Sequence, residues 1–209
     1  FNYKKDKVTA SLQLAAGHGG YLGNFNSYRT YPKQGTYSAS ETSFTGKNSY
    51  FNVRAGLDYA FTPELTLGLN LSYTPEKDRP VRQNDTRDYR IAPNGSLELL
   101  RSLPGTADEL DKGSYTSANV HLEKSFKETP KRRFSWDLDF AGYRQEEGRN
   151  FTSRGFTPQG ALIPGSDFRF NSTTNQRTDS YITSLDYTEP LGKGTLSFGA
   201  KGTWTRTRN

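Results

Sequence analysis

Residues 50–74, YFNVRAGLDYAFTPELTLGLNLSYT, carry the pattern that decides the fold. Apolar and polar residues alternate on both sides of a short turn at residues 62–64. A period of two belongs to a β-strand, because successive side chains of an extended chain point to opposite faces. The stretch therefore predicts a hairpin of two strands, each with one apolar and one polar face. The apolar positions are Phe51, Val53, Ala55, Leu57, Tyr59, Phe61, Leu65, Leu67, Leu69, Leu71 and Tyr73.

The same arrangement recurs along the chain, with tight turns inside each pair and long polar stretches between pairs. The other expected strands cover residues 1–4, 7–31, 115–127, 133–145, 179–187 and 195–207. The long connections cover residues 32–49, 75–113 and 146–178. Short turns at one end and long loops at the other are typical of outer-membrane β-barrels. We expect an all-β, antiparallel transmembrane β-barrel in the bacterial outer membrane, with short periplasmic turns and long extracellular loops.

The composition agrees with such a barrel and excludes a helical membrane protein. Only 32% of the residues are hydrophobic, and the mean hydropathy is -0.87. No segment approaches the roughly 18 continuous apolar residues of a spanning helix. In a barrel with a wet lumen only every second strand residue meets lipid, so the mean hydropathy stays low.

Three local features lead to more detailed expectations. The glycines between Gly17 and Gly23 predict a bulge or bend at the barrel rim. Apolar spacing within residues 96–103 predicts a short helix that ends at Pro104. The chain begins and ends inside expected strands, so we interpret residues 1–209 as a single domain of seven strands plus part of an eighth, and as a segment of a longer chain.

The positive charge does not indicate a nucleic-acid partner. The formal net charge is +6 and the pI is about 9.4, but the basic residues are dispersed. The one run of three, residues 131–133, falls in an expected turn. We expect the partners to be outer-membrane lipid and lipopolysaccharide, whose phosphates attract such side chains, and no nucleic acid.

Few residues suit catalysis, and we expect neither an enzyme nor a cofactor. The chain has two histidines and no cysteine, and it lacks a Gly-x-Ser-x-Gly motif. His121 lies on a polar strand face with Glu123, and Asp137 or Asp139 is expected opposite it. These groups suit either a metal or acid/base pair or a hydrogen-bond network in the lumen, and the sequence leaves both open.

Two sets of loop residues are candidates for binding. The acidic residues Asp108, Glu109 and Asp111 are close enough in sequence to share a hard cation, although such residues are also common on solvated surfaces. The basic residues of the long connection suit a charged substrate or lipopolysaccharide, and the sequence does not choose between these ligands. They are Arg79, Arg82, Arg87 and Arg90.

Four segments resemble the outer-membrane barrel domains of TonB-dependent receptors, especially those of Bacteroidota. They are FNYKKDKVTASL, SYFNVRAGLDYAFTPELTLGLNLSY, SFKETPKRRFSWDLDFAGY and SYITSLDYTEPLGKGTLSFGAKGTW. The resemblance implies a barrel of about 22 strands with an N-terminal plug. It also implies gated uptake of a ligand, energised by an inner-membrane complex if a plug lies upstream. A surface lipoprotein or another outer-membrane subunit is a further expected partner.

Three alternatives stay open on the sequence. The barrel could be a structural or assembly platform that transports nothing, or a small eight-stranded membrane anchor whose interior is filled by side chains. The chain could also be a soluble carbohydrate-binding β-sandwich. The sandwich requires the strand leucines and aromatics to converge between two layers, whereas the barrel requires them to face outward from one layer. The deciding residues are Leu67, Leu69, Val120, Leu138 and Phe198.

Overall fold

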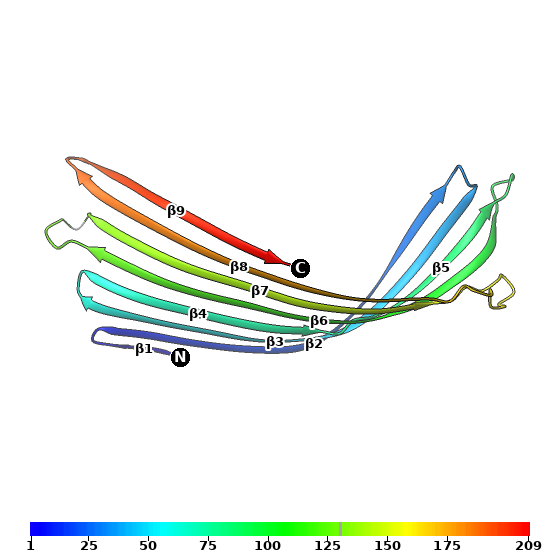
Figure 1. The fold of residues 1–209 in the computed structure, drawn as a ribbon, viewed down its shortest axis with the longest axis horizontal. Helices are drawn as coiled ribbons and strands as arrows, with labels where there is room; N and C mark the ends of the chain where they lie inside the picture. The colour runs from blue at the N-terminus through cyan, green and yellow to red at the C-terminus, as the bar shows by residue number, and fades with distance from the viewer. Residues whose placement is uncertain (130) are drawn as a thin grey trace.

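The computed structural model describes residues 1–129 and 131–209, and every regular element in these residues is a β-strand. Nine strands form one curved sheet (Figure 1). Their bounds are β1 Asn2–Lys5, β2 Val8–Tyr31, β3 Thr36–Thr62, β4 Leu65–Asp78, β5 Val81–Ile91, β6 Leu97–Ser125, β7 Arg133–Ser153, β8 Phe168–Leu191 and β9 Gly194–Arg208.

The strands are antiparallel neighbours in the order β1-β2-β3-β4-β6-β7-β8-β9, and β5 pairs with β3 and β6. Strand β5 continues the course of β4, because both lie between β3 and β6 and only Arg79 and Pro80 separate them. The sheet is therefore eight strands wide at its short-turn end, whereas β1 and β9 do not reach the opposite end, where β2, β3, β5, β6, β7 and β8 continue. The expectation of seven strands and part of an eighth is confirmed, with β1 as the partial strand.

The sheet is a single layer without an apolar interior. Among the described residues with apolar side chains only Ala107 and Pro80 are buried, whereas Leu69, Leu138 and Phe198 are 37%, 39% and 60% exposed. These side chains do not converge between two layers. The β-sandwich alternative is therefore wrong, and the apolar face of the sheet is open to contact with lipid.

The short turns lie together at one end of the sheet, and the long connections lie at the other (Figure 1). The last hairpin turns through Gly192 and Lys193 alone, which is tighter than the gap expected between the strands at residues 179–187 and 195–207. Gly192 adopts a positive φ of 59°, as two-residue hairpin turns require. The predicted turn at residues 128–132 includes Pro130, which lies outside the described residues.

Much of the expected loop sequence is strand. Strands β2, β3, β6, β7 and β8 are 21 to 29 residues long, and a transmembrane strand needs only about 9–11 residues. The predicted helix at residues 96–103 is wrong, because Leu97–Ser125 is strand β6 and pairs with β5. Its leucine spacing was misleading, since pairing with a distant segment overrides a weak local helical pattern.

The glycines of β2 do not form a bulge, because the register between β2 and β3 is unbroken from Val8 to Tyr31. Two of them instead give room to rings on β3. A Cβ at Gly17 would lie 2.3 Å from the Tyr50 ring, and one at Gly23 would lie 2.5 Å from the Phe44 ring. The sheet curls upward at the end that carries the long connections (Figure 1).

Candidate functional site: the polar face of the wall and its rim

The strand register collects the alternating residues of each strand into two continuous faces. One row of paired positions across the sheet is almost entirely apolar, and the adjacent row is polar. The apolar row is Val8, Tyr59, Leu67, Leu122, Trp136, Leu185 and Ala200. The polar row is Thr9, Asp58, Gly68, His121, Asp137, Ser184 and Lys201.

The middle of the polar face carries a network of hydrogen bonds between strands. The Asn119 amide donates to Asp139 Oδ1 at 2.8 Å and accepts from Asn70 Nδ2 at 3.4 Å. The Ser72 and Ser117 hydroxyls lie 2.7 Å apart. Polar groups that are partly buried need such partners, because an unpaired one costs free energy. The network thus corresponds to the lumen hydrogen-bond alternative for this face.

Gly68 brings His121 and Asp58 together across an intervening strand. His121 Nε2 lies 3.3 Å from Asp58 Oδ1, although β4 separates their strands. A Cβ at Gly68 would lie 1.8 Å from His121 Cε1 and 2.3 Å from Asp58 Oδ1. The contact therefore requires glycine at this position. The sequence predicted Asp137 or Asp139 beside His121, and the register does pair His121 with Asp137. The sequence did not predict the contact with Asp58.

Charged residues gather on the polar face above the membrane-spanning part of the strands. The Glu109 side chain is only 3% exposed. Its Oε1 forms ion pairs with Arg149 Nε at 2.8 Å and with Arg82 Nε at 3.2 Å. Asp111, on the same strand face, has a buried Oδ1 without a hydrogen-bond partner among the described residues. Burial, followed by the nearby Glu147, Glu109 and Asp78 carboxylates, raises the pKa of Asp111.

Tyr21 contributes to the same cluster from β2. Its hydroxyl donates to Asp78 Oδ2 at 2.7 Å. Burial and this hydrogen bond raise the pKa of Tyr21 to about 12, so the phenol stays neutral and remains a donor. The ring crosses Gly46, where a Cβ would lie 2.2 Å from Cζ. At the end of the polar face that carries the long connections, neighbouring strands are thus joined by charge pairs and by aromatic rings that pack over glycines.

The four candidate arginines do not form one site. Arg82 and Arg90 lie on one face of β5, and Arg87 lies on the other, as their pairing with alternate β3 positions shows. Arg82 is paired with Glu109, Arg87 Nη2 lies 2.7 Å from Asp85 Oδ2, and Arg79 lies at the step between β4 and β5. Consecutive strand positions point to opposite sides, so proximity in sequence did not predict convergence.

The three candidate acidic residues are divided in the same way. Glu109 and Asp111 share the polar face, whereas Asp108 points to the opposite face of β6. Within residues 1–129 and 131–209, no group of three His, Cys, Asp or Glu side chains could hold a metal ion.

No helix in this part of the chain has the length and apolar character to cross a bilayer.

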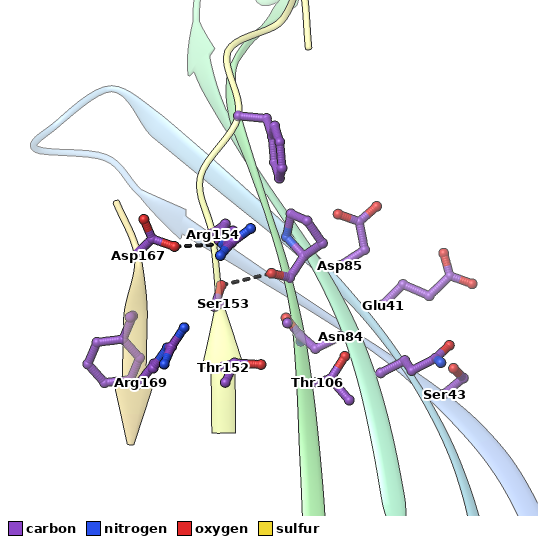
Figure 2. Close-up of a pocket in the computed structure, with 15 residues that line it drawn as sticks. Glu41, Ser43, Asn84, Asp85, Thr106, Thr152, Ser153, Arg154, Asp167 and Arg169 are labelled. Atoms are coloured by element: carbon purple, nitrogen blue, oxygen red, sulfur yellow. Dashed lines mark hydrogen bonds and ion pairs between the residues drawn. The ribbon is translucent and has the colours of Figure 1, made fainter. Parts of the chain in front are cut away.

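We call the parts of β3, β5, β6, β7 and β8 that continue beyond the membrane-spanning part the extension. A polar hollow of about 780 Å³ lies on the face of the extension that is opposite to the lumen (Figure 2). One paired row, Ser43, Gln83, Thr106, Thr152 and Arg169, crosses its floor. Glu41 and Asp85 lie one row above, and Arg154 Nε pairs with Asp167 Oδ1 at 2.6 Å at the end of the hollow. Sequence reasoning missed this feature because it treated these segments as loops.

Comparisons with known proteins support the barrel interpretation. Residues 124–209 match the profile of the family described as outer membrane protein beta-barrel family. No curated protein matches the chain. Two solved structures from Pseudomonas aeruginosa are similar at 8% identity: FpvA bound to heterologous pyoverdines and the ferripyoverdine receptor of the outer membrane bound to ferripyoverdine.

The alignments cover 94% and 97% of this chain, with TM-scores of 0.28 and 0.23, which are too low to carry an argument. The chain spans 37% of the length of each receptor. The fold itself and the family match therefore carry the assignment. Residues 124–209 match the outer membrane protein beta-barrel family, and the chain forms an antiparallel β-barrel wall in the outer membrane.

Proposed function

We propose that this wall belongs to a TonB-dependent receptor-like transporter that takes up a ligand across the outer membrane by gating and without covalent chemistry. The observation that carries the proposal is a polar face that continues over eight neighbouring strands of an open sheet. Its charged members include Arg54, Asp139 and Lys201. A lysine that faced lipid at mid-membrane depth would cost roughly 2–4 kcal/mol, so this face suits a wet lumen.

The open edges favour a wide barrel over a small one. Strands β1 and β9 lie at opposite edges of the sheet and do not pair with each other (Figure 1). A sheet in a bilayer cannot leave backbone groups unpaired, so we propose that further strands complete the wall. An eight-stranded barrel would instead close on itself and fill its interior with side chains.

The extended hairpins suit contact with ligand or partner at the cell surface. We propose that they form the extracellular mouth, with the short turns in the periplasm. An upstream plug and an energising inner-membrane complex complete the proposed mechanism. A non-transporting platform is the second candidate, and the polar hollow on the outer face of the extension favours it, because that hollow lies outside the lumen.

Uptake by cells that carry or lack the full-length protein tests the proposal. We expect at least one compound to disappear from the medium only when the protein is present and the proton gradient is intact, as measured by mass spectrometry. A Ser117→Cys variant modified with a bulky water-soluble maleimide should lose uptake, because Ser117 faces the lumen. Asp108→Cys, modified on the other face, is the matched control.

Two results would count against transport. One is a folded protein whose loss changes no compound in the medium, which would favour the platform. The other is equal uptake after modification at positions 117 and 108.

A further inference from the structure

The outward face above the apolar band carries a row of three arginines on neighbouring strands. The register pairs Arg144 of β7 with Arg177 of β8, and Arg177 with Arg208 of β9. Each lies on the same face of its strand as the lipid-facing residues below it. Arg206 lies on the same face of β9, one pair position lower. We call Arg144, Arg177, Arg206 and Arg208 the outward arginine cluster.

The cluster stands directly above an aromatic belt. Phe140, Tyr181 and Trp204 are paired across the same three strands, with ring centroids 5.1 Å and 5.3 Å apart. Arg144, Arg177 and Arg208 each lie four residues beyond the ring on their own strand, about 13 Å along the strand. Aromatic belts mark the interface between hydrocarbon and headgroups, so the cluster lies at headgroup level.

The protein offsets only part of the positive charge of the cluster, because a single carboxylate in the described part of the chain, Asp179, lies beside Arg177 and opposite Arg206 in the register. Arg177 Nε pairs with Asp179 Oδ2 at 2.7 Å, and the Asp179 side chain is 12% exposed, which holds this guanidinium in place. No carboxylate lies within 4.0 Å of Arg144, Arg206 or Arg208 among the described residues. Like charges on directly paired positions repel each other, so an anion between them would stabilise the arrangement.

An open groove of about 690 Å³ follows the cluster along the outer face. It is lined by Arg144, Arg177 and Arg208, and it continues to Lys77 and Lys112. Lys112 pairs with Glu146 at 3.2 Å. The groove therefore combines several cations with few acids beside the lipid surface. An anionic group that is part of a lipid would occupy it while its acyl chains contact the apolar band.

We propose that the outward arginine cluster binds the phosphates of a phosphorylated glycolipid of the outer leaflet, of the lipid A type. The guanidinium groups offer paired donors to phosphate oxygens, and the belt below them packs against the lipid chains. The site is separate from the lumen and from the four arginines near β5. It does not depend on what the barrel transports.

Lipid retention by the purified full-length protein tests this site. The probe is bisphosphorylated lipid A in mixed detergent micelles, with its binding measured by titration. Arg144→Gln/Arg208→Gln should weaken binding about 10- to 30-fold, because each basic residue near a lipid surface contributes about three- to fivefold. Arg54→Gln/Lys201→Gln removes the same charge from the lumen face and should leave binding unchanged.

Binding measurements with two further probes identify the source of the phosphate. Dephosphorylated lipid A should bind to the unmodified protein as weakly as bisphosphorylated lipid A binds to the arginine variant. Inorganic phosphate should not displace bisphosphorylated lipid A from the unmodified protein. Equal loss in both variants, equal binding of both lipids, or displacement by inorganic phosphate would overturn the proposal. If the arginine variant assembles poorly, salt titration of the unmodified protein decides, because only binding of the phosphorylated lipid should weaken with salt.

Discussion

Leu69→Arg is the sharpest test of which face meets lipid. Leu69 lies midway along the apolar positions 65–73 of β4 and pairs with Leu57 and Val120. The eight steps from Leu65 to Tyr73 cover about 27 Å along the strand, or about 21 Å across the membrane at a tilt of about 40°. Leu69 therefore lies about 10 Å from either interface, where an arginine is most costly.

The expected loss of stability for Leu69→Arg is about 2–4 kcal/mol, or roughly 30- to 900-fold in the folding equilibrium. Tyr73→Arg, at the edge of the band, should cost only about 0–1 kcal/mol. Asn70→Arg places the same charge on the adjacent polar face and should cost less than about 1 kcal/mol, because water and nearby Asp139 can solvate it.

Denaturant unfolding of the full-length protein in lipid vesicles measures these differences. Heat-dependent migration in detergent gels gives a second reading of how much folded barrel each variant forms. The face assignment is refuted if Leu69→Arg and Asn70→Arg have the same effect, or if Asn70→Arg is the more damaging change.

Three further predictions follow from the geometry of the polar face. Gly68→Ala should cost about 1–3 kcal/mol, because its Cβ would lie 1.8 Å from His121 Cε1 and 2.3 Å from Asp58 Oδ1, and His121→Ala in the same protein should recover part of the loss in a denaturant titration. The pKa of Asp111 is raised in the folded protein, so its contribution is favourable at acid pH and is lost as the pH rises through that pKa. Asp111→Asn should therefore raise the unfolding temperature near pH 7.5 and have little effect near pH 4, and the reverse order would contradict the burial argument. Because the chain has no cysteine, Asn119→Cys should react with a water-soluble maleimide while Val120→Cys stays unlabelled, and equal labelling would show that the two positions share one solvent.

The separation of the two faces could be predicted from the sequence because it depends on local backbone geometry alone. Every second residue of an extended strand shares a face, so Leu67, Leu69 and Leu71 had to lie together. The short turns were equally local, since Pro63 and Gly192 stop or redirect a strand where they occur. The placement of His121 on the polar face follows from the same rule.

The composition of the sites was decided only by pairing between distant segments. A strand pattern does not state its partner or register, so the contact of His121 with Asp58 across Gly68 was not visible in the sequence. The same limit concealed the division of the four candidate arginines and the row of Arg144, Arg177 and Arg208.

Alternation along one chain thus determined that this protein has a lipid face and a wet face. The tertiary structure decided how far the strands continue beyond the membrane and which charges meet there. The physical reason is that side-chain direction is set by the backbone of each residue, whereas register is set by hydrogen bonds between strands that are far apart in sequence.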